Sequence, residues 1–580
     1  MRNIKYSQIL RLNNELADTI ESEDYNVAVL SNISIHQIKE ICEFSLRTEG
    51  LNATVKVGDY DNIVQDSIRY NRCNLGIVFW ELCNVIDGMQ YKIELYNDSQ
   101  FNSMIEKIKS EIDLVLKNFQ GVSLVLFNKF SSLQFSNSNI RKNKLEELKE
   151  QLNLYLEDNL PVNVKMVELE KVIADVGVKK SIDLRNFYSS KALYTVEFFK
   201  AYIDYIRPFI MSANGKAKKA LIFDCDNTLW KGILGEDGFD GIEMSAKTRD
   251  GIVFSEVQII ALYLNKRGIL IGLCSKNNPG DVDEVIKTHT DMQLREEHIA
   301  INKSNWSDKV TNLREIAWDL NIGLDSLVYI DDSPFEVNLI KKHLPDVIVL
   351  QVPERLYEYP EMLKNNIELF YNLSLSVEDK ERVKMYKQQS MREGAKRTFA
   401  DIKDYLASLD LRITIYKDDE SIIPRMSQMS QKTNQFNLTT RRYTDSDISK
   451  FIACEDSTVF SFSVADKFGD NGMVGMCIIN IDNKTRTVDI DTFLMSCRII
   501  GRNIEYAFMD YLMNFLSNNS RIDNVTAKYI KTPKNQLVKE FYDKCSLILT
   551  ESSGSVSNYT LSINEYNSKN LDYIKVVNGK

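Results

Sequence analysis

Two aspartates follow a short apolar run at residues 220–223, in the stretch ALIFDCDNTLW. The carboxyl ends of parallel strands meet the crevice in which α/β folds bind ligands, so Asp224 and Asp226 are expected to face a site there. Carboxylates at this spacing can divide the work of phosphoryl transfer: Asp224 attacks phosphorus, and Asp226 donates a proton to the departing oxygen. A phosphate substrate also needs cations, because both carboxylates repel it.

Three further polar elements follow in chain order and can supply what the aspartates lack. Ser275 ends the run ILIGLCS and is expected to donate a hydrogen bond to a phosphoryl oxygen. Lys309 opens a helical pattern and is expected to neutralise the same group. Hard oxygen ligands suit Mg²⁺, and the run VYIDD adds more of them. The sequence therefore predicts a Mg²⁺ site formed by Asp224, Asp226, Asp331 and Asp332.

The ordered set DCDNT, strand-Ser, a single lysine and strand-DD resembles the four motifs of the haloacid dehalogenase (HAD) phosphatase superfamily. Its spacing is compact, since no large insertion separates Leu229 from Leu264 or Lys276 from Asp308. The resemblance implies a Rossmann-like parallel sheet with a minimal cap over residues 206–370. A lone DxD after a strand is also found in turns and helix caps, but four ordered elements together favour the phosphatase site.

The amino-acid sequence around these motifs is similar to that of the FkbH-like proteins. These are HAD members of subfamily IIIC that act in polyketide and related carrier-protein pathways. The similarity continues through QKTNQFNLTTRRYT, DKFGDNGMVG and LMSCRIIGRNIE, and so covers most of the chain. It implies an enzyme that takes a glyceryl unit from 1,3-bisphosphoglycerate, removes the remaining phosphate and passes the acyl group to an acyl carrier protein. Two alternatives stay open: a simple Mg²⁺-dependent phosphatase acting on a small phosphate ester, and a scaffold that binds carrier proteins.

Acyl transfer of this kind needs a thiol, and two cysteines lie beside the motifs. Cys225 stands between the two aspartates, and strand alternation turns it away from the crevice if both aspartates face it. Cys274 precedes Ser275 and is the preferred candidate, because strand geometry often relaxes where a strand meets its loop. For both cysteines the alternative is a buried thiol that only fills space.

Residues 411–580 show antiparallel strand patterns followed by a helical pattern, and they resemble the α+β fold of GNAT acyltransferases. In RIIGRN, Arg498, Gly501 and Asn503 resemble a Q/RxxGxG/A turn, in which backbone N–H groups at a helix start hold a pyrophosphate. Asn503 replaces the usual small residue, which argues against ordinary CoA binding and favours a role in receiving the phosphopantetheine arm of the carrier protein. A plain helix cap is the alternative. Arg441 and Arg442 are expected either to pair with acidic carrier residues or to lie on a solvated face.

The remaining segments predict the elements that position these residues. Residues 1–205 alternate strand-like and helix-like runs, which indicates a parallel α/β domain. This domain resembles the SGNH-hydrolase-like type. Ser31 follows the first strand as a nucleophile would, but the nearest histidine, His36, lies on the next helix, so this domain is expected to be non-catalytic. The charged stretch 371–410 has a helical period and predicts a helical linker.

Composition and length limit the classes of protein to which this chain can belong. A chain of 580 residues with 44% hydrophobic and 27% charged residues predicts a multidomain soluble protein. The net charge of -10 argues against nucleic-acid binding, and no apolar run approaches the roughly 18 residues of a membrane span. Nine scattered cysteines without a CxxC pair fit a reducing compartment, and the amino terminus has no signal-peptide pattern. We therefore expect a cytoplasmic protein whose partners are a small phosphorylated substrate and a carrier protein.

Overall fold

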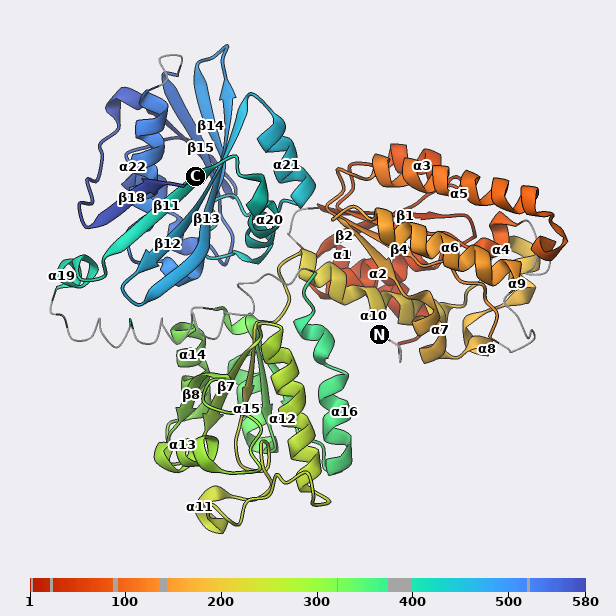
Figure 1. The fold of residues 1–580 in the computed structure, drawn as a ribbon, viewed down its shortest axis with the longest axis horizontal. Helices are drawn as coiled ribbons and strands as arrows, with labels where there is room; N and C mark the ends of the chain where they lie inside the picture. Colours follow the sequence, from red (N-terminus) through yellow and green to blue (C-terminus); the bar gives the residue numbers. More distant parts are fainter. Residues whose placement is uncertain are drawn as a thin grey trace. The chain divides into compact units, whose positions relative to one another are not determined.

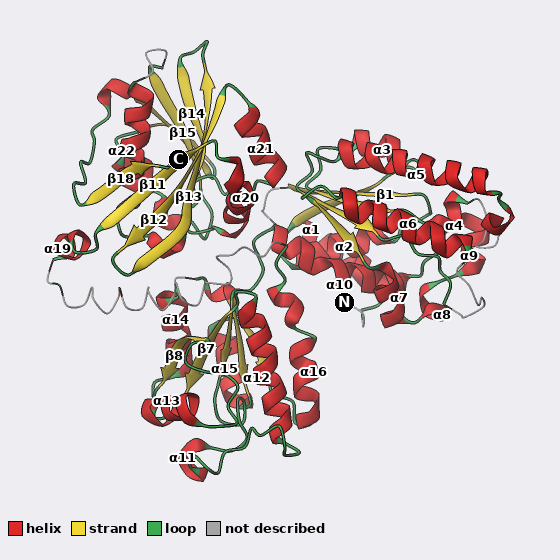
Figure 2. Cartoon of the chain, viewed as in Figure 1, coloured by secondary structure: helices red, strands yellow, loops and turns green. Residues whose placement is uncertain are grey.

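The computed structural model describes residue 1 and residues 4–20, 24–86, 92–135, 143–320, 322–373, 392, 399, 401–518 and 522–579. The chain divides into two compact units, Met1–Ala213 with Tyr443–Asp447, and Asn214–Arg442 with Ile448–Lys580. Within the described residues it forms three sheets, each accompanied by helices (Figure 1, Figure 2). The predicted multidomain α/β architecture is confirmed.

The amino-terminal sheet has five parallel strands in the order β2-β1-β3-β4-β5. On one face the apolar sides of α3, α5 and α6 bury a continuous core that includes Ile63, Phe101 and Leu148. The strands are β1 (Asp24–Ser31), β2 (Asn52–Val57), β3 (Leu75–Phe79), β4 (Leu124–Asn128) and β5 (Val164–Val167). The main helices are α1 (Tyr6–Ala17), α2 (Ile38–Thr48), α3 (Ile63–Arg69), α5 (Asp98–Asn118), α6 (Lys144–Asn159), α7 (Leu169–Val176) and α10 (Val196–Ala213).

The second sheet is also parallel, with the order β10-β9-β6-β7-β8, so that β6 lies at its centre. Its strands are β6 (Ala220–Phe223), β7 (Leu270–Ser275), β8 (Ile299–Ser304), β9 (Leu327–Asp331) and β10 (Ile348–Gln351). One face packs against α12 (Gly251–Lys266), α13 (Pro279–Thr288) and α16 (Tyr359–Lys364), and the other against α14 (Lys309–Asp319) and α15 (Pro334–His343). This is the predicted Rossmann-like three-layer arrangement.

The predicted minimal cap is confirmed. Between β6 and α12 the chain forms only the short helix α11 (Leu234–Asp237) and an antiparallel bridge that joins Lys231 to Glu243. Asn227 begins this segment with a φ of 51°, a left-handed conformation that asparagine tolerates better than most residues. The carboxyl edge of the sheet is therefore covered by short segments rather than by a separate cap domain.

The carboxyl-terminal sheet is mixed, as the GNAT-like α+β prediction requires, and has the order β16-β17-β15-β14-β13-β12-β11-β18. Its central strands β14 and β15 are parallel but pair only between Thr487–Ile490 and Asn524–Ala527, so they diverge beyond that point. The strands are β11 (Leu411–Lys417), β12 (Ser457–Asp466), β13 (Gly469–Asp482), β14 (Thr487–Met495), β15 (Asn524–Ile530), β16 (Ile548–Ser553), β17 (Val556–Ser562) and β18 (Ile574–Asn578). The main helices are α20 (Ile423–Lys432), α21 (Asp445–Ala453) and α22 (Ile504–Ser517).

One predicted domain boundary falls inside a helix. The predicted border between residues 205 and 206 falls inside α10, which continues to Ala213 because its apolar face, including Ile206 and Ile210, stays buried. Most of the predicted linker 371–410 lies outside the described residues, and its described end contains the short helix α19 (Ile402–Ala407). Among the described helices, none combines the length and apolar character that crossing a bilayer requires.

Candidate active site

The candidate site lies at the carboxyl edge of the second sheet, where sheet order brings separate motifs together. Phe223 of β6 is paired with Ile330 of β9 on one side and with Leu273 of β7 on the other. In this parallel register the residues that follow each strand reach the same edge. Asp224 therefore lies between Asp331 and the loop that starts at Ser275.

Lys309 joins the aspartates of two strands. Its ammonium lies 2.7 Å from Asp331 Oδ2 and 3.1 Å from Asp224 Oδ2. All three side chains are buried. Lys309 is the first residue of α14, whose N-cap Asp308 accepts a hydrogen bond from Thr311 N at 2.8 Å. The cap fixes the start of the helix and so the direction from which Lys309 enters the site.

The electrostatics of this group follow from burial and close charges. Burial raises the pKa of Asp224 to about 6, and the Asp331 charge adds to the increase, although Lys309 and a hydrogen bond with Ser275 oppose it. Burial alone would lower the pKa of Lys309, but Asp224 and Asp331 hold it above its usual value. Lys309 therefore stays protonated and compensates the charge of the buried aspartates.

A carboxylate cluster suited to a hard cation is present. Asp224, Asp331 and Asp332 each offer an oxygen, and these oxygens all lie within 4.8 Å of one another. Asp224 Oδ1 is buried and accepts no hydrogen bond within the described part of the chain. A buried carboxylate oxygen without a donor is costly unless a cation contacts it, and oxygen donors of this kind suit Mg²⁺. The residues present thus fit a Mg²⁺ ion held by these three aspartates.

Asp226 is predicted to be a metal ligand, but the structure does not group it with the other three aspartates. Its Oδ1 accepts hydrogen bonds from Trp230 Nε1 at 2.9 Å and from Leu234 N at 3.1 Å, and its Oδ2 accepts one from Asn277 Nδ2 at 2.9 Å. The carboxylate is therefore engaged by N–H donors rather than grouped with the other three aspartates. Its half-buried position at the open edge remains suited to proton transfer with a substrate oxygen.

Neither cysteine beside the motifs has the setting of a nucleophile. Cys274 is fully buried in the apolar cluster beneath α14 and α15, and Cys225 is fully buried in the cluster on the opposite face of the sheet. Burial raises the pKa of both thiols, which disfavours the thiolate that would attack a carbonyl. The prediction that Cys274 carries the acyl group is therefore not supported, because β7 alternation directs Ser275, not Cys274, to the site.

The predicted pyrophosphate turn lies at the start of α22. Gly501 has a φ of 82° with open space at its Cβ position, so the backbone there is accessible. Asn503 has a left-handed conformation and donates a hydrogen bond to the hydroxyl of Tyr573 at 2.7 Å. The adjacent Arg502 is buried and ion-paired with Asp466 at 3.0 Å. The side chain of Arg498 lies outside the described part of the chain.

The gap between β14 and β15 is filled by the chain itself. Leu438 N donates to Phe493 O at 3.1 Å, Met495 N donates to Phe436 O at 2.9 Å, and Ile530 N donates to Leu438 O at 2.8 Å. Phe436 and Leu438 are buried, and so is Asn437, whose carbonyl accepts a hydrogen bond from Asn535. A phosphopantetheine arm that forms hydrogen bonds with these backbone groups of β14 and β15 would have to displace residues 436–438.

Two other groups of candidate residues have internal partners. Arg441 pairs with Asp491, and Arg442 donates hydrogen bonds to the carbonyl of Thr433 at 3.2 Å and to the carbonyl of Ser430. In the amino-terminal domain, Ser31 Oγ accepts a hydrogen bond from Ile33 N at 3.1 Å. His36 is exposed, and the described contacts do not link it to Ser31. The expectation that this domain is non-catalytic stays a prediction.

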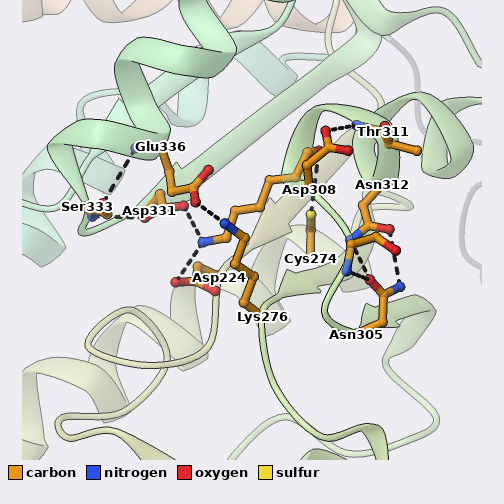
Figure 3. A network of polar contacts seen from close by, with 12 residues as sticks. Asp224, Cys274, Lys276, Asn305, Asp308, Thr311, Asn312, Asp331, Ser333 and Glu336 are labelled. Carbon is orange, nitrogen blue, oxygen red and sulfur yellow. Dashed lines mark hydrogen bonds and ion pairs between the residues drawn. The ribbon is translucent and has the colours of Figure 1, made fainter.

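Several residues of the site were not identified from the sequence. Asn277 links Asp226 to Ser275, and the hydroxyl of Thr228 is buried without a hydrogen-bond partner among the described residues. Lys276 forms an ion pair with Glu336 at 2.7 Å (Figure 3). The position of Lys276 directly after Ser275 could have placed it near the site. Its pairing with Glu336 could not be predicted, because that pairing depends on the order of the strands.

The comparisons with known proteins agree with this architecture. The chain matches no family model and no curated protein. Among solved structures it is similar to the N-terminal part of the protein BF1531 from Bacteroides fragilis, which contains a phosphatase domain complexed with Mg. That similarity has 24% identity and a TM-score of 0.54, and it covers 64% of this chain and 100% of the other. It shows a shared fold.

Two acetyltransferase structures align with smaller parts of the chain. A chimera of spermidine N-acetyltransferase from Vibrio cholerae has 9% identity and a TM-score of 0.22, and covers 27% of this chain and 97% of its own. The second is an acetyltransferase from Salmonella typhimurium that modifies the N-terminal serine of ribosomal protein L7/L12. It has 16% identity and a TM-score of 0.21, and the similarity covers 26% of this chain and 94% of the acetyltransferase. TM-scores this low do not establish a shared fold. The GNAT-like description therefore depends on the mixed sheet with its diverging strands. On sheet order and strand register, the chain combines a parallel α/β domain with a carboxyl-terminal mixed α+β domain, and it shares the fold of the phosphatase-containing structure from Bacteroides fragilis.

Proposed function

We propose that this chain is a Mg²⁺-dependent phosphatase and glyceryl transferase, which dephosphorylates a three-carbon unit from 1,3-bisphosphoglycerate and delivers it to an acyl carrier protein. The observation that carries the phosphatase part is the buried group of Asp224, Lys309 and Asp331, in which Asp224 Oδ1 has no hydrogen-bond partner in the described chain. The choice of substrate and carrier rests on the resemblance to FkbH-like proteins.

The residues divide the phosphate chemistry as follows. Asp224 attacks phosphorus, the P–O bond to the alcohol breaks, and Asp226 donates its proton to the leaving oxygen. Water then attacks the phosphoaspartate, Asp226 takes the proton, and phosphate leaves with Asp224 regenerated. Lys309 and Ser275 hold the transferred group in place and offset its charge. A bound Mg²⁺ would supply further charge neutralisation at the carboxylates that hold it.

The acyl step uses the other end of the same substrate. A thiolate attacks the acyl-phosphate carbonyl, a C–S bond forms, and inorganic phosphate departs with the electrons of the C–O bond. Because Cys225 and Cys274 are buried, we assign this thiol to the phosphopantetheine arm of the carrier protein. The carrier thiol then forms the thioester directly. A reducing cytoplasm would keep that thiol available.

A simple Mg²⁺-dependent phosphatase is the second candidate, and the lack of an exposed thiol among the described motif residues favours it. A pure scaffold is disfavoured, because buried charges of this kind cost folding stability. A scaffold would have no use for them, whereas a phosphatase needs them for catalysis. Phosphate release from p-nitrophenyl phosphate with and without Mg²⁺ tests the shared phosphatase step. We expect Mg²⁺-dependent release that Asp224→Asn lowers by on the order of a thousandfold or more, with unchanged circular dichroism. Equal release by the variant would remove Asp224 from the mechanism.

A further inference from the structure

The end of β7 and the loop after it carry three consecutive side chains that make polar contacts, those of Ser275, Lys276 and Asn277. Ser275 and Asn277 lie on the reaction side, where Asn277 Nδ2 is 3.4 Å from Ser275 Oγ and 2.9 Å from Asp226 Oδ2. Between them, Lys276 extends to Glu336 Oε1 at 2.7 Å. The loop that supplies the phosphate-binding hydroxyl therefore also supplies a second lysine, in addition to Lys309.

Sheet order shows where this second lysine lies. Lys276 follows β7, whereas Glu336 belongs to α15, which follows β9. These two strands are not neighbours, because β6 lies between them, and Asp224 directly follows the end of β6 at Phe223. The Lys276–Glu336 ion pair thus joins the two flanks of the nucleophile at the carboxyl edge of the sheet, as the close view of the network shows (Figure 3).

The two partners of this ion pair differ in exposure. The Glu336 side chain is 9% exposed, whereas that of Lys276 is 42% exposed. Glu336 is held in the first turn of α15, where its backbone N–H donates to Ser333 Oγ. Its Oε2 is buried and has no hydrogen-bond partner in the described chain. A fixed, buried carboxylate therefore orients an ammonium that remains open to solvent.

An ammonium has three N–H donors, and within the described residues Glu336 is the single polar partner of Lys276. Donors thus remain for an anion that enters from solvent. Lys309 differs, since it is buried and already contacts two carboxylates of the site. The site has one buried lysine beside the nucleophile and one exposed lysine at its edge.

We propose that Lys276 is a specificity-determining residue that binds a second phosphate of the substrate, at the end remote from the phosphate that is hydrolysed. Glu336 acts as the positioning residue for Lys276. This inference rests on the proposed phosphatase function, and it specifies substrates that carry two phosphates on one short carbon chain. A charge-assisted hydrogen bond of this kind changes binding by about tenfold to a hundredfold.

The test compares two substrates that differ only in the second phosphate, propane-1,3-diol bisphosphate and 3-hydroxypropyl phosphate, with the full-length chain and Mg²⁺. We expect wild type to prefer the bisphosphate in kcat/KM. Lys276→Met should lower the ratio of kcat/KM for the bisphosphate to that for the monophosphate by about tenfold to a hundredfold, mainly through KM. Glu336→Gln should lower the ratio in the same direction by less, because the lysine keeps its charge but loses its fixed position.

Lys287→Met is the matched control, since Lys287 is an exposed lysine on α13 outside the site. It should leave the substrate ratio as in wild type. An equal loss for both substrates in Lys276→Met, or an unchanged ratio, would overturn the proposal while leaving the phosphatase function in place. If wild type hydrolyses neither compound but remains folded, the proposed function itself is wrong, and this inference falls with it.

Discussion

Lys309 is the residue on which the charge balance of the candidate site depends. Its ammonium contacts Asp224 and Asp331, and all three groups are buried. An ion pair in such a setting contributes little net stability, but the loss of one partner leaves an uncompensated buried charge. The arrangement therefore indicates a functional origin for the cluster.

Lys309→Met tests this balance. We expect the free energy of unfolding in urea to fall by about 3 to 5 kcal/mol without Mg²⁺, because two aspartates lose their buried counter-charge. Added Mg²⁺ should restore more stability to the variant than it adds to wild type, since a cation replaces the missing charge. Lys287→Met provides the control for loss of an exposed lysine. A Lys309→Met variant as stable as wild type in the absence of Mg²⁺ would contradict the account.

Cys274→Ser tests the thiol assignment. The serine hydroxyl would be buried in an apolar cluster, which costs about 1 to 3 kcal/mol unless it finds a partner. Phosphate release and carrier acylation should therefore fall together with the melting temperature, and peptide mass spectrometry of the wild-type protein should find no acyl adduct on Cys274. Cys274→Ala, which buries no hydroxyl, is the matched variant. Loss of carrier acylation alone, at unchanged melting temperature, would restore Cys274 as the acyl carrier.

At the scale of elements, the strand ends could be predicted from sequence and the contacts between them could not. Asp224, Ser275 and Asp331 follow apolar runs, so their shared edge follows from a parallel sheet. The Lys276–Glu336 ion pair required the strand order, which an apolar pattern does not contain. The filling of the gap between β14 and β15 by residues 436–438 was likewise unpredicted, because QFNLTT has no strong strand pattern and its pairing is tertiary.

The end of β3 carries a buried acid whose titration can be measured. Glu81 Oε1 accepts a hydrogen bond from Tyr194 at 2.9 Å, while its Oε2 is buried without a hydrogen-bond partner in the described chain. Burial raises the pKa of Glu81 to about 8, from an ordinary value of 4.5. The folded domain therefore keeps a proton that the unfolded chain releases, and its stability falls as pH rises from 4.5 to 8.

Glu81→Gln removes this titration while keeping an acceptor for Tyr194. The stability of the variant relative to wild type should increase with pH and reach at most about 5 kcal/mol near pH 8, the linkage limit for a shift of this size. Urea unfolding at pH 5 and pH 8 measures the two differences. A relative stability that is the same at both pH values would show that Glu81 is ionised in the folded domain.

At the scale of the whole molecule, one chain carries two parallel α/β domains and a carboxyl-terminal domain with a mixed sheet. The charged site lies in the second parallel domain, whereas the serine of the first domain lacks a histidine partner among the described contacts. In the GNAT-like domain the gap between the diverging strands is filled by the chain. We therefore propose that the phosphate chemistry takes place in one domain and that the acyl-accepting thiol belongs to a separate carrier protein.

The most direct test is intact-mass analysis of a phosphopantetheinylated acyl carrier protein after incubation with this chain, Mg²⁺ and 1,3-bisphosphoglycerate. We predict that the carrier gains one glyceryl unit, and that with Asp224→Asn it gains a phosphoglyceryl unit instead, because the ester phosphate is no longer removed. A carrier without phosphopantetheine should gain nothing. A carrier whose mass stays unchanged while wild type releases phosphate would contradict the glyceryl transfer and leave a simple phosphatase.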